Sequence, residues 1–419
     1  MTRRRRRNTK RRVSSREFIR FRMTESGRLL ALGTIATVML GSLTLDIPIF
    51  HLCTGLVVLF VVAAAVGFAY WPRCAVLGGF EGKAVAGEPV WGHYTVRNRW
   101  GLPAYDVSVG LFDLPREIEV IEHAPTAHRL AGKESVRLAM AIRPLRRGLY
   151  TLDGLRVYST FPFNLFRTGP AVDRRESLLV LPRFHPLHTV DVPVGTRYQP
   201  GGIALTSHVG ESPEYIGNRD YRPGDPFRRI EPRAWARLGT PVVREYQEEY
   251  YCRVAVVLDT FIPPRRGKPK PTGFADLEAG VSLAAAVADA MSRGEYIIDF
   301  FAAGPDLYVF RSGRHTALLE NMLEILASVD ECRTNPFEAV TPALSEELAT
   351  VSAVIFVLLD WDDSRRRLVR AAVEAGCSAR VAIVREGETS LSYAEDEAWT
   401  GPVVQVTPRQ VRAGGMDRL

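Results

Sequence analysis

The sequence lacks the short motifs that mark the commonest catalytic sites. Its 419 residues contain no G-x-x-x-x-G-K-[ST] phosphate loop, no G-x-S-x-G elbow, no H-E-x-x-H zinc motif and no G-x-G-x-x-G that opens a helix. These absences exclude the enzyme classes built on those motifs, and we expect the protein not to be an enzyme. A hydrolase of another kind, built from Asp225, Asp259 and His208, is the alternative that they leave open.

Cysteine is also scarce. The chain has five cysteines, with no C-x-x-C pair and no histidine partner at zinc-ligand spacing: Cys53, Cys74, Cys252, Cys332 and Cys377. An odd number of widely spaced cysteines argues against a disulfide framework, so we expect reduced packing residues. His185 and His188 are three residues apart, but no third ligand is evident, and we expect them to be exposed loop residues.

Acidic residues are nearly absent from the first 28 positions. This basic tail, residues 1–28, holds twelve Lys or Arg against Glu17 and Glu25, a local charge of +10 in a chain whose net charge is +7. The remainder therefore carries −3, which does not favour a nucleic-acid partner. A basic run beside a membrane span typically sets topology and contacts lipid headgroups. A nucleic-acid-binding arm and a cleaved signal peptide are the alternatives.

Two long uncharged stretches follow the basic tail. Leu29–Leu45 spans 17 residues and Ile49–Trp71 spans 23, neither with a Lys, Arg, Asp or Glu. Both fall in the range of about 17–25 residues for a membrane-spanning helix, so residues 29–71 are predicted to form a two-helix transmembrane hairpin. Tyr70 and Trp71 supply an interfacial anchor. By the positive-inside rule, we expect a multi-pass protein of the inner (plasma) membrane whose soluble domains are cytoplasmic.

Short alternating apolar and polar runs, separated by Gly and Pro, fill residues 73–183. The clearest cover residues 90–96, 105–109, 135–140, 148–152 and 178–181. Each is typical of a strand with one solvated face. Their spacing predicts an antiparallel β-sandwich of the immunoglobulin-like or fibronectin-like kind.

Residues 184–251 are predicted to be a connector followed by an arginine-rich segment that begins at Glu211. Arg222-Pro223-Gly224-Asp225 predicts a chain reversal, because Pro fixes a negative φ and Gly permits a positive one. Local acids are too few to pair bidentately with all seven arginines, so we expect some to contact a partner or another domain, with a purely structural clamp as the alternative. The predicted contact residues are Arg219, Asp220, Tyr221, Gly224, Asp225, Arg228, Arg229, Arg237 and Arg244.

This segment resembles the signature of a known family. The resemblance is carried by Glu214-Tyr215, Arg219-Asp220-Tyr221, Pro223-Gly224-Asp225-Pro226, Arg228-Arg229-Ile230, Ala236-Arg237 and Val243-Arg244-Glu245-Tyr246-Gln247-Glu248-Glu249. These phrases are similar to those of the family called domain of unknown function 58. Arg147-Gly148-Leu149-Tyr150 and residues 161–166 are similar to phrases that precede the signature. Members carry a Trp where this chain has Pro232, and Trp235 is the candidate to replace it.

Apolar runs of about six residues alternate with helical patterns over residues 252–407. Strands are predicted at residues 253–258, 296–301, 307–310, 353–359, 379–384 and 403–406, and helices at 275–293, 316–328 and 364–375. The alternation predicts an α/β domain with a parallel, doubly wound sheet, in which ligands bind at the carboxyl ends of strands. Residues 408–419 are expected to form a C-terminal tail.

Asp259 and Asp360 follow two of these strands, in an arrangement that resembles a von Willebrand factor type A domain. That resemblance implies a divalent metal held by Asp-x-Ser-x-Ser and a later Asp. Here Phe261 and Pro263 take both serine positions, so hydroxyl ligands are missing from the six or so oxygens that Mg²⁺ requires. We expect no cofactor, with Mg²⁺ at a degenerate site of Asp259 and Asp360 as the alternative. Without a metal, Asp259 is expected to cap a helix or pair with an arginine.

Together with the family resemblance, these features predict a membrane-anchored cytoplasmic scaffold or adaptor for protein complex assembly or remodelling. The resemblance implies a bacterial or archaeal origin, a MoxR-type AAA+ ATPase as partner and, in some cases, a transglutaminase-like membrane protein. The lipid bilayer is the other expected partner, and no nucleic acid is expected. A metal-dependent adhesion module or an uncharacterised hydrolase is the alternative function.

Overall fold

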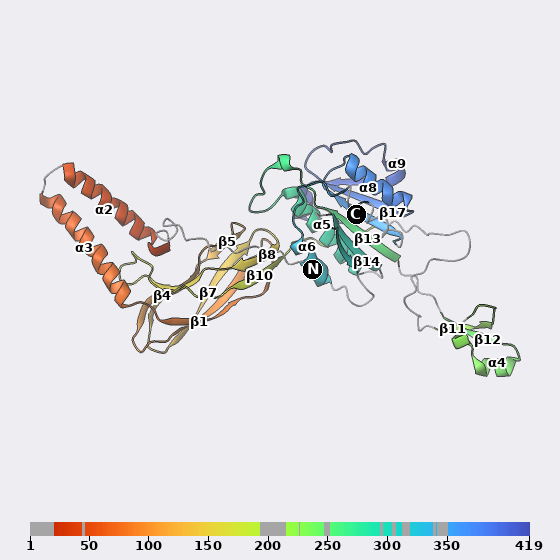
Figure 1. The fold of residues 1–419 in the computed structure, drawn as a ribbon, viewed down its shortest axis with the longest axis horizontal. Helices are drawn as coiled ribbons and strands as arrows, with labels where there is room; N and C mark the ends of the chain where they lie inside the picture. The colour runs from red at the N-terminus through yellow and green to blue at the C-terminus, as the bar shows by residue number, and fades with distance from the viewer. Residues whose placement is uncertain are drawn as a thin grey trace. The chain divides into compact units, whose positions relative to one another are not determined.

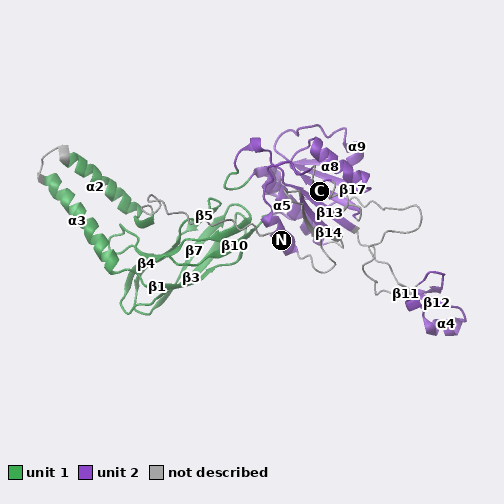
Figure 2. Ribbon diagram, in the orientation of Figure 1, with its two compact units in different colours: residues 1–183, 269–273 green, residues 184–268, 274–419 purple. Residues whose placement is uncertain are grey.

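The structure is a computed structural model. It describes residues 21–43, 47–192, 215–225, 227–246, 252–293, 296–303, 307–311, 319–337, 341 and 351–419. The chain divides into two compact units (Figure 2). One comprises residues 1–183 with 269–273, and the other comprises residues 184–268 with 274–419. Most of the basic tail, part of the connector and residues 211–214, 226 and 247–251 of the arginine-rich segment lie outside the described residues.

Two helices begin the first unit, α2 (Glu25–Leu43) and α3 (Ile47–Ala69), and they pack side by side (Figure 1). Among the described helices, the segment Pro48–Ala69 of α3 is long and apolar enough to cross a membrane. Only 11% of its most apolar window is buried, which distinguishes it from the core helix of a soluble domain. Of the predicted pair of spans, one therefore meets this test among the described helices.

The predicted β-sandwich region, which we continue to call the β-sandwich region, consists of ten strands. They are β1 (Cys74–Phe80), β2 (Lys83–Val85), β3 (Val90–Asn98), β4 (Ala104–Leu111), β5 (Ile118–Glu122), β6 (Ala127–Leu130), β7 (Ser135–Pro144), β8 (Gly148–Leu152), β9 (Leu155–Ser159) and β10 (Glu176–Leu181). They form sheets of order β1-β3-β7-β5, β2-β10-β8 and β6-β4-β9. All of these pairings are antiparallel except β2 with β10.

Alternation along the strands places one apolar core between these sheets. In β3, Tyr94 and Val96 are buried, whereas His93 and Arg97 point to solvent. Facing strands contribute to the same cluster, for example through Met140 of β7. The alternating pattern seen in the sequence is thus confirmed as antiparallel sheets with one dry face.

The second unit contains a six-stranded sheet of order β15-β14-β13-β16-β17-β18. Its strands are β13 (Cys252–Asp259), β14 (Tyr296–Ala303), β15 (Leu307–Arg311), β16 (Ala353–Leu358), β17 (Ser378–Val384) and β18 (Val403–Val406). In chain order this is 3-2-1-4-5-6, a doubly wound arrangement whose order reverses between β13 and β16. The predicted parallel sheet is confirmed except at β15, which pairs antiparallel with β14.

Helices cover both faces of this sheet. Helices α5 (Ala275–Ser292), α6 (Leu319–Ser328) and α10 (Pro408–Ala413) pack on one face, and α8 (Asp363–Glu374) and α9 (Glu397–Thr400) pack on the other. Successive residues of β13 enter opposite cores, Val256 on the α5 side and Val257 on the α8 side. Because both faces are buried, the strand is a continuous apolar run rather than an alternating one.

Both ends of the predicted α/β region differ from expectation. Leu187, from the predicted connector, is buried against the α5 side of the core. Residues 408–419 are not a free tail, because α10 packs on α5 and Leu419 is buried. Thr407 and Gln410 form a capping box that starts α10, and Gly414, with a φ of 69°, ends it.

The arginine-rich segment folds as a small lobe, residues 215–246, which we call the arginine lobe. It comprises β11 (Tyr215–Asp220), the 3₁₀ turn η1 (Phe227–Arg229), α4 (Pro232–Leu238) and β12 (Val242–Tyr246), with β11 antiparallel to β12. The predicted reversal is confirmed: the Asp225 N–H donates to the Arg222 carbonyl at 3.0 Å, and Gly224 has a φ of 107°.

Candidate functional site

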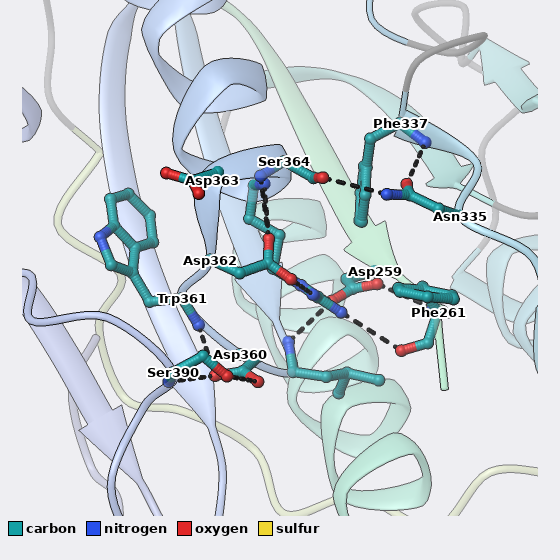
Figure 3. Close-up of polar contacts among 12 residues, drawn as sticks. Asp259, Phe261, Asn335, Phe337, Asp360, Trp361, Asp362, Asp363, Ser364 and Ser390 are labelled. Carbon is teal, nitrogen blue, oxygen red and sulfur yellow. Dashed lines mark hydrogen bonds and ion pairs between the residues drawn. The ribbon is translucent and has the colours of Figure 1, made fainter. Parts of the chain in front are cut away.

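The carboxyl ends of β13 and β16 lie next to each other where the strand order reverses, and the two predicted metal ligands are found there (Figure 3). Asp259 is the last residue of β13, and Asp360 follows β16 by two residues. This is the edge at which doubly wound sheets bind ligands. Both aspartates thus lie at the edge that was expected from the sequence, and the chemistry of this edge depends on what each carboxylate contacts.

Asp259 is completely buried, and both of its oxygens accept protein donors. The Phe261 N–H donates to Oδ1 at 2.8 Å, and the Leu359 N–H donates to Oδ2 at 2.9 Å. Nε of Arg365 also donates to Oδ2, at 2.6 Å. The carboxylate thus joins β13 to the end of β16 and to α8, and its charge is neutralised by a guanidinium.

Arg365 lies in the first turn of α8 and is itself only 1% exposed. Its Nη1 lies 2.5 Å from Oδ2 of Asp362, and its Nη2 donates to the Phe261 carbonyl at 3.2 Å. The Phe261 and Phe337 rings lie 5.5 and 5.1 Å from its Cζ. Burial alone would lower the Arg365 pKa, but the Asp259 and Asp362 charges outweigh it and raise the pKa, so Arg365 keeps its positive charge.

Local sequence explains why Arg365 is held at this position. Asp362 is the N-cap of α8, and its Oδ1 accepts from the N–H groups of Ser364 at 3.1 Å and Arg365 at 3.0 Å. The other oxygen of Asp362 contacts the guanidinium three residues on. One acidic residue therefore both starts the helix and orients the buried arginine.

Asp360 has a separate set of partners. Its Oδ1 accepts from the N–H groups of Trp361 and Ser390, each at 2.8 Å, and its Oδ2 accepts from the Ser390 hydroxyl at 2.7 Å. Nη1 of Arg385 lies 2.5 Å from the same Oδ2. Burial alone would raise the Asp360 pKa, but the bonds from Ser390 and Trp361 and the Arg385 charge outweigh it and lower the pKa.

These contacts do not fit a divalent metal held by Asp259 and Asp360. Each carboxylate carries its own arginine, and no hydrogen bond joins the two in the described part of the chain. Among the described residues, no group of three or more His, Cys, Asp or Glu is placed to hold a metal ion. Phe261, at a position where the von Willebrand resemblance implies a hydroxyl ligand, instead packs its ring over Arg365.

Arg365 was not predicted from the sequence. An arginine partner for Asp259 was expected, but nothing in the sequence identified it, because this arginine comes 106 positions later in the chain. The available signal was Asp362 three residues before Arg365 at the start of a predicted helix, a spacing that brings two side chains together on a helix.

A second buried carboxylate supports the same edge from α9. Asp396 accepts from Nε1 of Trp361 at 3.0 Å, from Nε of Arg366 at 2.8 Å and from Nε1 of Trp399 at 3.1 Å. Burial alone would raise the Asp396 pKa, but these donors outweigh it and lower the pKa. Beside it, a cavity of about 420 Å³ is lined by Asp363, Arg366, Arg367 and Arg370.

In the arginine lobe, two predicted arginines are used internally. Arg219 pairs bidentately with Asp225, Nη1 to Oδ2 and Nη2 to Oδ1, both at 2.8 Å. Hydrogen bonds from Arg219 and from the Arg222 N–H lower the Asp225 pKa to about 2. Arg244 pairs with Glu231, the residue that precedes α4. These two pairs tie β11 to the turn and β12 to α4, so both act within the lobe.

The remaining arginines of the lobe include several that face solvent. Within the described residues Arg229, Arg233 and Arg237 form no ion pair, and Arg233 and Arg237 are exposed. Arg228 is exposed as well. Tyr221 lies beside Phe227, with ring centroids 6.2 Å apart. Phe227 is 79% exposed and Trp235 is 44% exposed, so this lobe presents both positive charge and aromatic surface.

No disulfide joins the described cysteines. Cys53, Cys74, Cys332 and Cys377 are free thiols, and burial raises the pKa of Cys74 to about 11, so that its thiol stays protonated. Cys332 and Cys377 are buried, as predicted for packing residues, whereas Cys53 and Cys74 are half-buried.

Comparisons with known proteins do not assign a family. No family model matches the chain, and no curated protein matches it. Among solved structures it is similar to the GH20 exo-β-N-acetylglucosaminidase of Vibrio harveyi, in complex with N-acetylglucosamine at 8% identity and as its D437A inactive mutant at 11%. The TM-scores are 0.15 and 0.14, and the match covers 74% of this chain and 57% of the enzyme chain. Scores this low carry no argument about fold or activity.

Proposed function

We propose that this protein is a membrane-anchored scaffold whose arginine lobe docks a protein partner. The observation that carries the proposal is that some arginines of the lobe form ion pairs within it and others do not. Arg219 and Arg244 hold its fold, whereas Arg229, Arg233 and Arg237 form no ion pair in the described part of the chain. A surface of arginines with exposed aromatic rings is typical of protein interfaces, where Arg and Trp are enriched.

Anchorage is supported by the helices of the first unit. Large apolar side chains of α3 are exposed, including Phe68 at 74%, and those of α2 are exposed too, including Leu29 at 70% and Leu32 at 65%. Such surface is unfavourable in water and favourable in hydrocarbon. We propose that α2 enters the bilayer beside α3 and that the basic tail keeps both chain ends in the cytoplasm, at the inner membrane.

The α/β domain is proposed to be of the von Willebrand factor type A kind and to bind protein without a metal. Its strand order and the position of Asp259 support the likeness, and the buried charge of Arg365 takes the place of a bound cation. This favours a scaffold over the alternative of a metal-dependent adhesion module. The basic cavity on α8 offers a second surface for an acidic partner.

The family resemblance of residues 214–249 names the partner we propose, a MoxR-type AAA+ ATPase, in complex assembly or remodelling. A transglutaminase-like membrane protein is the second partner that this resemblance suggests. The charge of the lobe predicts that the ATPase presents an acidic surface to it. Residues 215–246 hold seven arginines against four acids, a local charge of +3.

The test is binding of the purified full-length protein, in detergent micelles, to the purified MoxR-type ATPase of the same organism. The triple variant Arg229→Ala, Arg233→Ala and Arg237→Ala should weaken binding at least about tenfold, which is ~1.4 kcal/mol. The matched control is Arg97→Ala with Arg137→Ala, two exposed arginines of the β-sandwich region. Equal affinity of the triple variant and the unaltered chain would overturn the docking role of the lobe.

A further inference from the structure

One loop of the β-sandwich region packs along the helices that begin the first unit. The loop, residues 160–168, follows β9. The Thr24 N–H donates to the Leu165 carbonyl at 3.1 Å, just before α2 begins. A Cβ on Gly27 would lie 2.2 Å from the same carbonyl oxygen, and one on Gly67 would lie 3.1 Å from the Thr168 side chain. Both glycines therefore permit the loop to pack closely against the two helices.

The loop is apolar and follows α3 into the proposed membrane span. The Phe161 ring lies 5.5 Å from the Tyr70 ring, at the end of the helix. The Phe166 ring lies 5.8 Å from the ring of Phe60, which is about 14 Å back along the helix axis from Ala69. Phe163 is 49% exposed. An apolar loop beside the last turns of a spanning helix is suited to the boundary between headgroups and acyl chains.

Three arginines surround the base of this loop, and we call them the interfacial arginines: Arg22, Arg156 and Arg167. They lie over aromatic faces: Cζ of Arg156 is 4.2 Å from the Phe21 ring, and Cζ of Arg22 is 5.1 Å from the Trp71 ring. Cζ of Arg167 lies 5.7 Å from the Tyr158 ring. These rings hold the guanidiniums in place through cation–π contacts, at the level where α3 leaves the proposed span.

Two of the interfacial arginines have no acidic partner among the described residues. Among the residues that the structure describes, Arg156 and Arg167 form no ion pair, and Nε of Arg156 is buried without a hydrogen-bond partner. Burial and the positive charge of Arg156 both lower the pKa of Arg22, so these two guanidiniums lie close enough to repel each other. Nη1 of Arg167 donates to the Phe21 carbonyl at 3.4 Å, which orients it but does not neutralise it.

We propose that the interfacial arginines bind the phosphate of an anionic phospholipid, while residues 161–166 insert at the headgroup boundary. Guanidinium forks match phosphate oxygens bidentately, and the aromatic faces hold these guanidiniums in place. This inference rests on the proposed membrane anchorage, because the bilayer brings the lipid to the site. It makes the β-sandwich region a second, lipid-selective contact with the membrane surface.

The test uses native mass spectrometry of the full-length protein released from bilayers of phosphatidylglycerol and phosphatidylcholine in equal amounts. The unaltered chain should retain phosphatidylglycerol preferentially. Arg156→Gln with Arg167→Gln should lower this retention on the order of tenfold. Arg97→Gln with Arg137→Gln, the matched control, should leave it unchanged. Arg156→Lys with Arg167→Lys keeps the charges and should preserve most of the preference even if packing over the rings is weakened.

Equal retention of phosphatidylglycerol by the glutamine variant and the unaltered chain would overturn the inference. So would arginine-dependent binding of inorganic phosphate in lipid-free detergent without any phosphatidylglycerol preference, which would assign the cluster to a soluble anion. Carbonate extraction of native membranes separates the two proposals. A chain that stays in the membrane but shows no lipid preference contradicts only this inference, whereas a chain released by carbonate contradicts the anchorage and the inference together.

Discussion

Nε of Arg365 donates to Oδ2 of Asp259 at 2.6 Å, and both side chains are almost completely buried. This pair joins the first strand of the sheet to helix α8, at the position where ligands approach a doubly wound sheet. Two opposite charges removed from water require full hydrogen bonding, and the partners of both groups supply it. The edge is therefore built around a fixed internal cation.

Breaking this pair should destabilise the α/β domain strongly. Arg365→Met leaves the Asp259 carboxylate buried without its counter-charge, which should cost about 3–5 kcal/mol and lower the melting temperature on the order of 10 °C. Scanning calorimetry of the detergent-purified protein measures this change in melting temperature. The double variant Asp259→Asn with Arg365→Met should be less destabilised than the sum of the single variants. Strict additivity would contradict the coupling of these two residues.

Divalent cations should not stabilise the protein. The carboxylates of Asp259 and Asp360 already accept protein donors at both oxygens, so a metal would have to displace Arg365 or Arg385. We expect the melting temperature to be the same with millimolar Mg²⁺, with Mn²⁺ and with EDTA. A saturable rise with either metal that is lost in Asp259→Ala would instead favour the metal-dependent module.

Periodicity in the sequence was enough to predict most of the fold. The alternation over Val90–Asn98 and the continuous apolar run in Cys252–Asp259 report how many faces of a strand are buried, so both kinds of sheet were predictable. Strand direction is not encoded this way, which is why β15 was not expected to be antiparallel. Helix α10 was missed although Thr407, Gln410 and Gly414 mark its two ends.

The site was predictable only in part, for a related reason. A carboxylate at the end of an apolar strand is visible in a sequence, so Asp259 and Asp360 were found. Which of 54 Lys and Arg residues neutralises each one depends on how helices pack on the sheet, and Arg365 and Arg385 were not identifiable beforehand. Likewise, seven arginines in one segment predicted more arginines than local acids could pair. The sequence did not indicate which of them form ion pairs within the lobe.

Stability should fall in acid through Asp360. Its folded pKa is lowered, so its contribution is fully present above the ordinary value of 3.8 and is lost as the pH falls from there through the folded pKa. The free energies of unfolding of the unaltered chain and of Asp360→Asn should therefore differ near neutral pH and converge below 3.8. Denaturant titrations across this range measure the difference. Asp173→Asn, an exposed carboxylate of the β-sandwich region, is the control and should show no such convergence.

Substitution of Asp225 should loosen the arginine lobe. This one carboxylate accepts hydrogen bonds from Nη1 and Nη2 of Arg219 and from the N–H of Arg222. Asp225→Asn should speed amide hydrogen exchange in β11 and β12 while exchange in β13 and β16 stays unchanged, since the described hydrogen bonds of Asp225 all lie within the lobe. Acid should have the same effect on the lobe. Because the pKa of Asp225 is about 2, its contribution to the stability of the lobe is lost as the pH falls from 3.8 towards 2. Asp220→Asn, an exposed neighbour, is the matched control. If Asp225→Asn and Asp220→Asn exchange at the same rate, the pair with Arg219 does not hold the lobe, and weaker partner binding by lobe variants must then come from lost contacts alone.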